Sequence, residues 1–421
     1  MKKKWMAMGL AAAMTVAGVA ALAGCTPADD EITVGFIALH DDNSTYDKNF
    51  LDAIREACAN KGIDDDHLII YTNVPEENDC YDKAVDLAGR CDVVFADSFG
   101  HEPFILAAAK EFPEVQFCHA TGTMAHTEGV ANHHNAFAHI YEGRYLAGVA
   151  AGMKLVEMHE AGKLKEANYD KDGNIKIGYV GAYPYAEVVS GYTSFFLGAQ
   201  SVVEEETDIS VSMEVTYTSS WFDEAAERES ANNLISRGAA LISQHADSMG
   251  APSACEVKGV PNVSYNGSTA NACPNTYIIS SRINWVPYFE YMIDCVMNGE
   301  EIAADWTGTL ATDSVALTEL GTAAAEGTAE KVAEVRAQLE AGTLNVFDCS
   351  KFTVTVTDEK NVNAEVDENG HLISYEADVD TDDAFTPDHE AIENGVFYES
   401  KHRSAPYFDV RIDGITELSE S

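Results

Sequence analysis

Strand-like and helix-like segments alternate along most of this 421-residue chain, and this alternation limits the possible folds more than any other feature. The apolar residues 32–38 are typical of a buried strand, and the spacing of Phe50, Ile54 and Cys58 predicts a helix that ends at Gly62. Further strands are expected at 67–72, 92–97, 115–119, 175–180, 211–217, 241–244 and 262–265, and helices at 81–89, 103–111, 141–159, 185–206, 225–237 and 248–258. Alternating β and α units require parallel sheets with right-handed crossovers. Two such series predict an α/β fold of two doubly wound parallel-sheet lobes.

The loops after the strands are the expected ligand-binding positions, because open α/β sheets bind ligands outside the carboxyl ends of their strands. Aromatic, amide, hydroxyl and carboxylate side chains gather in these loops, in the stretches 40–46, 98–101, 219–223, 244–248 and 264–267. Stacking of an aromatic ring on a nucleobase contributes about 1–3 kcal/mol to the binding free energy, while polar groups bind the edge of the base. The pattern therefore predicts a cleft for a flat, hydrogen-bonding molecule.

Each of these side chains also has a structural explanation. Trp221 and Phe222 could cover a helix end. Asp223 fits the N-cap of the helix that follows it, a position that aspartate favours. His245 and Asp247 could pair with each other or cap the next helix. The sequence alone leaves these alternatives open.

The first 25 residues have the organisation of a bacterial export signal. Three lysines at positions 2–4 precede an apolar run at 6–22, which is too short and too rich in small residues for a transmembrane helix. The run ends in Leu-Ala-Gly-Cys, which resembles the lipobox of bacterial lipoproteins. We expect a lipoprotein signal peptide at 1–24, lipidation of Cys25 and a tether at 25–30. An ordinary secretory signal with a chance cysteine is the alternative.

The charge of the chain is strongly negative, with 70 acidic against 26 basic residues and a net charge of −44. Such a field repels nucleic acid and anionic membrane surfaces, so we expect no nucleic-acid partner and membrane contact through the lipid anchor only. The repulsion also favours a monomer. An apolar fraction of 46% is enough for a substantial core.

Eight cysteines besides Cys25 permit disulfides in an exported chain, but the sequence does not assign partners. No CxxC pair or zinc-finger spacing occurs. Cys58 and Cys118 lie in apolar patterns, where a free buried thiol is the alternative expectation.

Several motifs together resemble the basic membrane protein family of ABC-transporter solute-binding lipoproteins, whose best-understood members bind purine nucleosides. The resemblance covers about residues 32–299. The motifs are Ser-Phe-Gly at 98–100, Phe-Cys-His-Ala-Thr-Gly at 117–122, Tyr-Glu-Gly-Arg-Tyr-Leu-Ala-Gly-Val-Ala-Ala-Gly at 141–152, Ile-Gly-Tyr-Val-Gly-Ala at 177–182, Ser-Trp-Phe-Asp at 220–223 and Gln-His-Ala-Asp-Ser at 244–248. The helix motif at 141–148 and the pair at 221–223 and 244–248 are the most specific.

The resemblance implies a type I periplasmic-binding-protein fold, in which two lobes joined by a three-stranded hinge close on a ligand. It places residues 31–138 and 285–315 in the first lobe, and 139–284 and 316–349 in the second. It also implies an ABC permease as partner, no cofactor and no metal.

The resemblance carries over unevenly to the ligand contacts. In the nucleoside binders a carboxylate after the last strand of the second lobe holds the ribose hydroxyls, and a lysine lies further on. Asn266 and Arg282 occupy those positions here. An amide binds a hydroxyl less strongly than a carboxylate does. The motifs at 221–223 and 244–248 look more like the branch associated with free purine bases.

We therefore expect a purine base, with or without its sugar, to lie against Trp221 with Tyr46 or Phe99 from the other lobe. Asp247, His245 and Asn266 would bind its edge. The full set of expected ligand contacts is Tyr46, Phe99, Trp221, Phe222, His245, Asp247, Asn266 and Arg282. A ligand-sensing surface receptor, or a binding protein for another flat heterocycle such as a flavin, is the alternative.

Residues 350–421 are expected to form an acidic, β-rich C-terminal extension packed on the second lobe. Residues 351–357 and 371–375 alternate like half-buried strands, Asp-Glu-Asn-Gly at 367–370 is a hairpin signal, and 376–388 is strongly acidic. A contact of this extension with the permease stays open.

No enzyme motif occurs: there is no G-x-S-x-G elbow, Walker loop or H-E-x-x-H. His245 near Asp247 is the only candidate base and partner. His133 and His134 are expected in a loop rather than at a metal. Residues 170–174 begin like a calcium loop but lack its closing glutamate, so a plain turn is expected.

Overall fold

The computed structural model describes residues 32–379 and 389–418. The predicted export signal, Cys25 and the predicted tether at 25–30 lie outside the described residues, as does most of the acidic stretch at 376–388. No helix among the described residues is long and apolar enough to cross a membrane.

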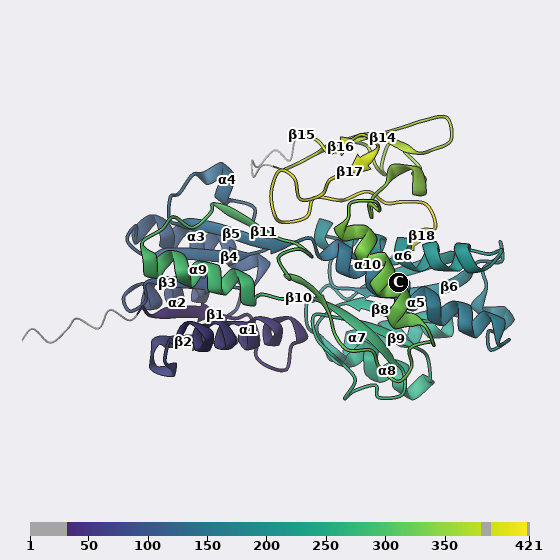
Figure 1. Cartoon of the computed structure of the whole chain (residues 1–421), viewed down its shortest axis with the longest axis horizontal. Coiled ribbons are helices and arrows are strands. Elements are labelled where there is room, and N and C mark those ends of the chain that lie inside the picture. The colour runs from purple at the N-terminus through teal and green to yellow at the C-terminus, as the bar shows by residue number, and fades with distance from the viewer. Residues whose placement is uncertain (1–31, 380–388, 419–421) are drawn as a thin grey trace, which may run out of the picture. The chain divides into compact units, whose positions relative to one another are not determined.

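The first sheet contains six parallel strands in the order β11-β5-β4-β3-β1-β2. The strands are β1 (Val34–Ile37), β2 (Leu68–Tyr71), β3 (Val93–Ala96), β4 (Gln116–Ala120), β5 (His133–Ala138) and β11 (Asp305–Gly308). The surrounding helices are α1 (Thr45–Lys61), α2 (Asn78–Ala88), α3 (Glu102–Glu111), α4 (Ala125–Glu128) and α9 (Val286–Asn298). Apolar residues of α1 and α9 pack with Phe36 and Phe95, whereas those of α2 and α3 pack with Ile37 and Val94. Figure 1 shows these helices around the strands of the sheet. Because neighbouring strand residues point to opposite faces, the sheet is buried on both sides.

The second sheet has seven strands in the order β12-β10-β9-β8-β6-β7-β18. They are β6 (Ile175–Gly181), β7 (Val211–Tyr217), β8 (Ile242–His245), β9 (Asn262–Tyr265), β10 (Tyr277–Ile283), β12 (Val315–Leu317) and β18 (Ile415–Glu417). Only β12 runs antiparallel, against β10. The helices are α5 (Ile140–Glu160), α6 (Ala186–Glu206), α7 (Glu224–Ser236), α8 (Gly250–Lys258) and α10 (Thr328–Glu340).

Three segments of the chain cross between the two sheets. They are residue 139 between β5 and α5, residues 284–285 between β10 and α9, and residues 309–314 between β11 and β12. The prediction of two doubly wound sheets linked by three crossings is confirmed. Asn49 on α1 also donates from Nδ2 to the carbonyl of Ile283 at 2.8 Å, which ties the first lobe to a crossing.

The C-terminal extension is built from short antiparallel strands: β13 (Ala364–Val366), β14 (Leu372–Ala377), β15 (His389–Glu390), β16 (Ile392–Glu393) and β17 (Val396–Phe397). The hairpin predicted at 367–370 is confirmed, because β13 pairs with β14 across it. The strand predicted at 351–357 is wrong. That segment begins in a short 3-10 turn (Cys349–Lys351) and continues as extended chain without a ladder, held by isolated bonds such as Val354 N to Gly370 O at 2.8 Å.

The structure decides three other predictions. His133 and His134 lie in β5 rather than in a loop, where both are buried. His134 is held there by the Ala303 carbonyl and the Gln116 side chain, so its polar groups are satisfied inside the sheet. The eight described cysteines are all free and buried, which decides the open question against disulfides among them. Residues 170–174 form a plain turn, in which Asp170 Oδ1 accepts from the backbone N–H groups of Asp172 and Asn174.

A buried carboxyl group in the C-terminal extension makes stability depend on pH. Glu399 is 1% exposed, and burial raises its pKa to about 8, with the carboxylates of Glu187 and Glu142 pushing it the same way. In the unfolded chain this carboxyl group has its ordinary pKa of about 4.5, so unfolding releases a proton between these pH values. Stability therefore falls as pH rises from about 4.5 to about 8.

We expect Glu399→Gln to remove the Glu399 share of this pH dependence, and burial of Glu142 and Glu227, whose pKa values are raised to about 7, leaves the remainder. Because one pKa unit corresponds to about 1.4 kcal/mol, the variant should be more stable than the wild type at pH 8 by about 1–4 kcal/mol. The difference should shrink towards pH 4.5. Urea unfolding at pH 5 and pH 8 measures it, with Glu365→Gln on an exposed position of the same extension as the control. Parallel pH profiles for wild type and Glu399→Gln would contradict this assignment.

Candidate functional site

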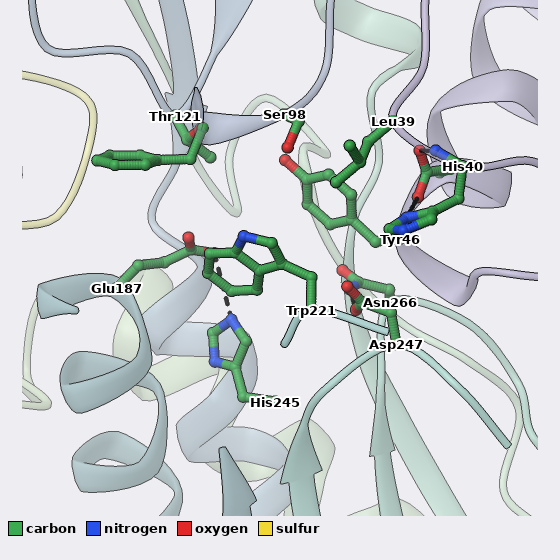
Figure 2. A pocket seen from close by; sticks show the side chains of 12 residues that line it. Leu39, His40, Tyr46, Ser98, Thr121, Glu187, Trp221, His245, Asp247 and Asn266 are labelled. Atoms are coloured by element: carbon green, nitrogen blue, oxygen red, sulfur yellow. Dashed lines mark hydrogen bonds and ion pairs between the residues drawn. The ribbon is translucent and has the colours of Figure 1, made fainter. Parts of the chain in front are cut away.

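A cavity of about 370 Å³ lies where loops from the carboxyl ends of both sheets meet. Part of this space is open to solvent. Figure 2 shows Tyr46 and Ser98 from the first lobe on one side and Trp221, His245 and Asp247 from the second lobe on the other. The lining residues are Leu39, His40, Tyr46, Asp47, Ser98, Phe99, Thr121, Glu187, Trp221, His245, Asp247 and Asn266.

On the first lobe two contacts hold the Tyr46 side chain in position, one at its hydroxyl and one at its ring. Its hydroxyl donates to the Asp97 carbonyl at 2.7 Å, and its ring lies edge to face against Phe50 with 4.9 Å between centroids. Asp97 directly follows β3, Phe50 lies on α1, and both are buried, so contacts with the core hold the phenol at the cavity. Phe99, in contrast, is 43% exposed at the cavity edge.

On the second lobe Trp221 is the largest ring of the cavity. Tyr183 lies edge-on to it at 5.2 Å and Tyr185 is tilted at 6.0 Å, so the indole is supported by two neighbouring aromatic rings. The Trp221 carbonyl accepts a hydrogen bond from Asp247 N at 3.0 Å. This bond ties the loop after β7 to the loop after β8 and fixes the indole relative to the polar groups.

Asp247 and Asn266 form a buried polar pair in the cavity. Asn266 Nδ2 donates to Asp247 Oδ1 at 3.2 Å, and both residues are at most 4% exposed. Burial raises the pKa of Asp247 well above its usual range, and the carboxylates of Asp47, Glu227 and Glu187 act in the same direction. Asn266 has a φ of 66°, a left-handed conformation that asparagine tolerates better than most residues. The pair offers a ligand both hydrogen-bond acceptors and amide donors.

His245 pairs with Glu187 rather than with Asp247. Its Nε2 lies 3.3 Å from Glu187 Oε1, and burial lowers the pKa of the imidazole. The candidate base and partner considered for catalysis are therefore engaged with other groups. Among the described residues no group of three or more His, Cys, Asp or Glu side chains could hold a metal ion.

The structure brings six of the eight expected contacts into one cavity: Tyr46, Phe99, Trp221, His245, Asp247 and Asn266. Phe222 and Arg282 are not among its lining residues. Phe222 packs against His40 with 5.4 Å between ring centroids, and Arg282 donates from a guanidinium N–H to Asn49 Oδ1 at 3.3 Å. Asp223 caps α7 by accepting from Ala225 N and Ala226 N, which confirms its structural explanation.

Six further lining residues were not among the expected contacts: Leu39, His40, Asp47, Ser98, Thr121 and Glu187. The position after a strand was a usable signal for Leu39, His40, Ser98 and Thr121, which follow β1, β3 and β4. Glu187 lies in the first turn of α6. The loop between β6 and α6 has no composition that marks it as a binding loop.

Comparison with known proteins gives a family-level match. Residues 33–346 match the model of the Bmp family, described as ABC transporter substrate-binding protein, PnrA-like. A purine-binding protein of Brucella abortus is 32% identical over 291 residues, which cover 68% of this chain and 74% of the relative. TsgA13 of Haloferax volcanii, named as an ABC transporter glucose-binding protein, is 31% identical over 264 residues. That match covers 63% of this chain and 61% of TsgA13, less than two thirds of its length.

Solved structures share the fold at low sequence identity. An ABC transporter solute-binding protein of Aeropyrum pernix has a TM-score of 0.62 at 15% identity, covering 78% of this chain and 94% of that one. One from Conexibacter woesei has a TM-score of 0.56 at 20% identity, covering 75% and 98%. At these identities the likeness shows the fold and leaves the ligand open.

Proposed function

This chain belongs to the Bmp family of PnrA-like ABC transporter substrate-binding proteins, and from that membership we propose that it captures a purine nucleobase or nucleoside in the cavity between its two lobes and delivers it to a permease. Substrate-binding proteins of this class act outside the cytoplasm and bind small molecules, and the family is not a class of enzymes.

The choice of ligand rests on one observation. The Trp221 indole, which packs against Tyr183, faces the same cavity as the buried pair of Asp247 and Asn266. A purine has two apolar faces and an edge of ring nitrogens and exocyclic groups. Trp221 can stack on the face, and Asp247 with Asn266 can bind the edge. The printed name of the Brucella abortus relative supports the same ligand class.

Calorimetry of the purified protein against a ligand panel tests this proposal. The panel contains adenine, guanine, hypoxanthine, adenosine and guanosine, with D-glucose and riboflavin as the competing classes. We expect saturable heat with at least one purine and none with glucose. Binding of glucose or riboflavin alone, or no heat with any purine, would refute the proposal.

The lipid anchor at Cys25 is a separate part of the proposal. Lipidation would hold the protein at the outer face of the cell membrane, because two or more acyl chains give stable attachment. We expect cells fed radiolabelled palmitate to label the wild type and not Cys25→Ala. Label retained by Cys25→Ala would show that the sulfur of Cys25 is not the acylated atom.

A further inference from the structure

A second and larger hollow, of about 1,670 Å³, opens directly beside the cavity. Phe99, Thr121, Glu187 and Trp221 line both spaces, so the two meet at this wall. We name the larger space the outer chamber. Its remaining walls come from Thr123, Met124 and residues 184–186 of the two lobes, and from Asn363, Tyr375, Asp378, Arg403, Tyr407 and Asp409 of the C-terminal extension.

The extension is attached to both lobes around this chamber. On the second lobe β18 pairs with β7, and Glu417 Oε1 accepts from the hydroxyls of Tyr192 at 2.9 Å and Tyr217 at 2.5 Å. On the first lobe Asp305 Oδ2 accepts from Ser404 N at 2.7 Å. The chamber wall formed by the extension is thus held in place from two sides.

The chemistry of the chamber suits a neutral group that carries hydroxyls. Its carboxylates are Glu187, Asp378 and Asp409, against the single guanidinium of Arg403. That guanidinium donates to the backbone carbonyls of Ala405, Val379 and Pro406, so three of its five N–H groups are used within the extension. Carboxylates accept hydrogen bonds from hydroxyl groups and repel phosphate.

Aromatic rings provide the other part of the chamber lining. Tyr185, Tyr375 and Tyr407 lie in its walls beside the shared rings of Phe99 and Trp221. Aromatic rings and carboxylates together can pack against an apolar ring face and bind its hydroxyl groups at the same time.

We propose that the outer chamber is a second part of the ligand site, in which the C-terminal extension receives an uncharged, hydroxyl-bearing substituent attached to the heterocycle in the inner cavity. The proposal rests on the proposed function and adds a role for the extension. The flat heterocycle lies in the inner cavity, and its hydroxyl-bearing substituent lies in the outer chamber. A substituent with phosphate is excluded by charge.

A substitution that fills the chamber tests this assignment. Asn363 lines the chamber, and its neighbour Val362 is 63% exposed and does not. Calorimetry compares adenine, adenosine and adenosine 5′-monophosphate on the wild type, on Asn363→Trp and on the matched control Val362→Trp. Circular dichroism and thermal unfolding check that both variants are folded.

We expect the wild type to bind adenosine at least as tightly as adenine, and the monophosphate at least tenfold more weakly than adenosine. Asn363→Trp should weaken adenosine at least tenfold and change adenine less than twofold, while Val362→Trp changes neither. The inference is overturned if Asn363→Trp leaves adenosine unchanged, if it weakens both ligands equally, if the monophosphate binds as well as adenosine, or if the wild type binds adenine but not adenosine. If the wild type binds none of the three probes, the same comparison is made with guanine, guanosine and guanosine 5′-monophosphate. If the wild type binds no purine of the calorimetric panel, the proposed function itself fails and the inference fails with it.

Discussion

Replacing Trp221 with alanine is expected to weaken purine binding about 5- to 150-fold. The reason is that stacking on an aromatic ring contributes about 1–3 kcal/mol per base, and each 1.4 kcal/mol corresponds to a tenfold change in Kd. The indole lies against Tyr183 and Tyr185 and is tied to the Asp247 loop, so it is positioned before the ligand arrives. Calorimetry on wild type and variant measures the change.

Two further variants separate stacking from general effects of losing a ring. Trp221→Phe keeps an aromatic face and should retain part of the affinity. Tyr81 lies on α2, away from the cavity, and its hydroxyl donates to Glu111. Tyr81→Ala therefore removes a ring without touching the site and should leave the Kd unchanged. If Trp221→Ala binds every purine as the wild type does, the indole takes no part in recognition.

Replacing Gly148 with valine is expected to prevent stable folding, because α5 and α6 touch through their backbones at this residue. A Cβ at Gly148 would lie 2.1 Å from the Phe195 carbonyl oxygen, and a Cβ at Gly198 would lie 2.1 Å from the Tyr145 carbonyl oxygen. Two backbones that approach through glycine cannot absorb a side chain without separating. Overpacking alone destabilises by about 1–3 kcal/mol, and the separation of two long buried helices adds to that.

Thermal unfolding and soluble yield measure this effect. We expect Gly148→Val to be insoluble or to unfold at least about 5 °C below the wild type. Gly89→Val is the control, since a Cβ at Gly89 meets only the Asp86 carbonyl at 3.6 Å, an ordinary contact. A Gly148→Val variant as stable as the wild type would show that the two helices can separate freely.

Much of the fold was predictable because its central helices and strands leave clear patterns in the sequence. The helix motif at 141–152 carries glycines where α6 approaches, and the apolar strands of both sheets are buried on both faces. Strands that must be apolar throughout leave a clear pattern in the sequence. In the extension the six-residue strand β14 was predicted from its alternation, whereas the strands of two or three residues are too short to show a period. Residues 351–357 alternate like a strand, yet they pair with no neighbouring strand.

The histidines of β5 show a second limit. His133 and His134 are polar enough to suggest a loop, yet they are buried in the first sheet between β4 and β11. Burial lowers the pKa of His134 to about 4, so it is neutral there and its nitrogens bond to groups on neighbouring chain segments. A sequence pattern does not contain those distant partners.

Most of the expected ligand contacts were predictable from position, because the carboxyl ends of parallel strands meet at one edge. The direction of a side chain was not. Phe222 and Arg282 lie at the expected places in the chain, but their side chains are held by His40 and Asn49 of the other lobe. Glu187 reaches the cavity from the first turn of α6, and its contact with His245 was indicated by no local pattern.

A crystal structure of the protein with the tightest-binding purine of the calorimetric panel tests the central claim most directly. We predict the base against the Trp221 indole, on the side of the cavity that faces Tyr46, with its edge within hydrogen-bonding distance of Asp247 or Asn266. A purine bound elsewhere, or one lying in the cleft without contact to the indole, would contradict the account.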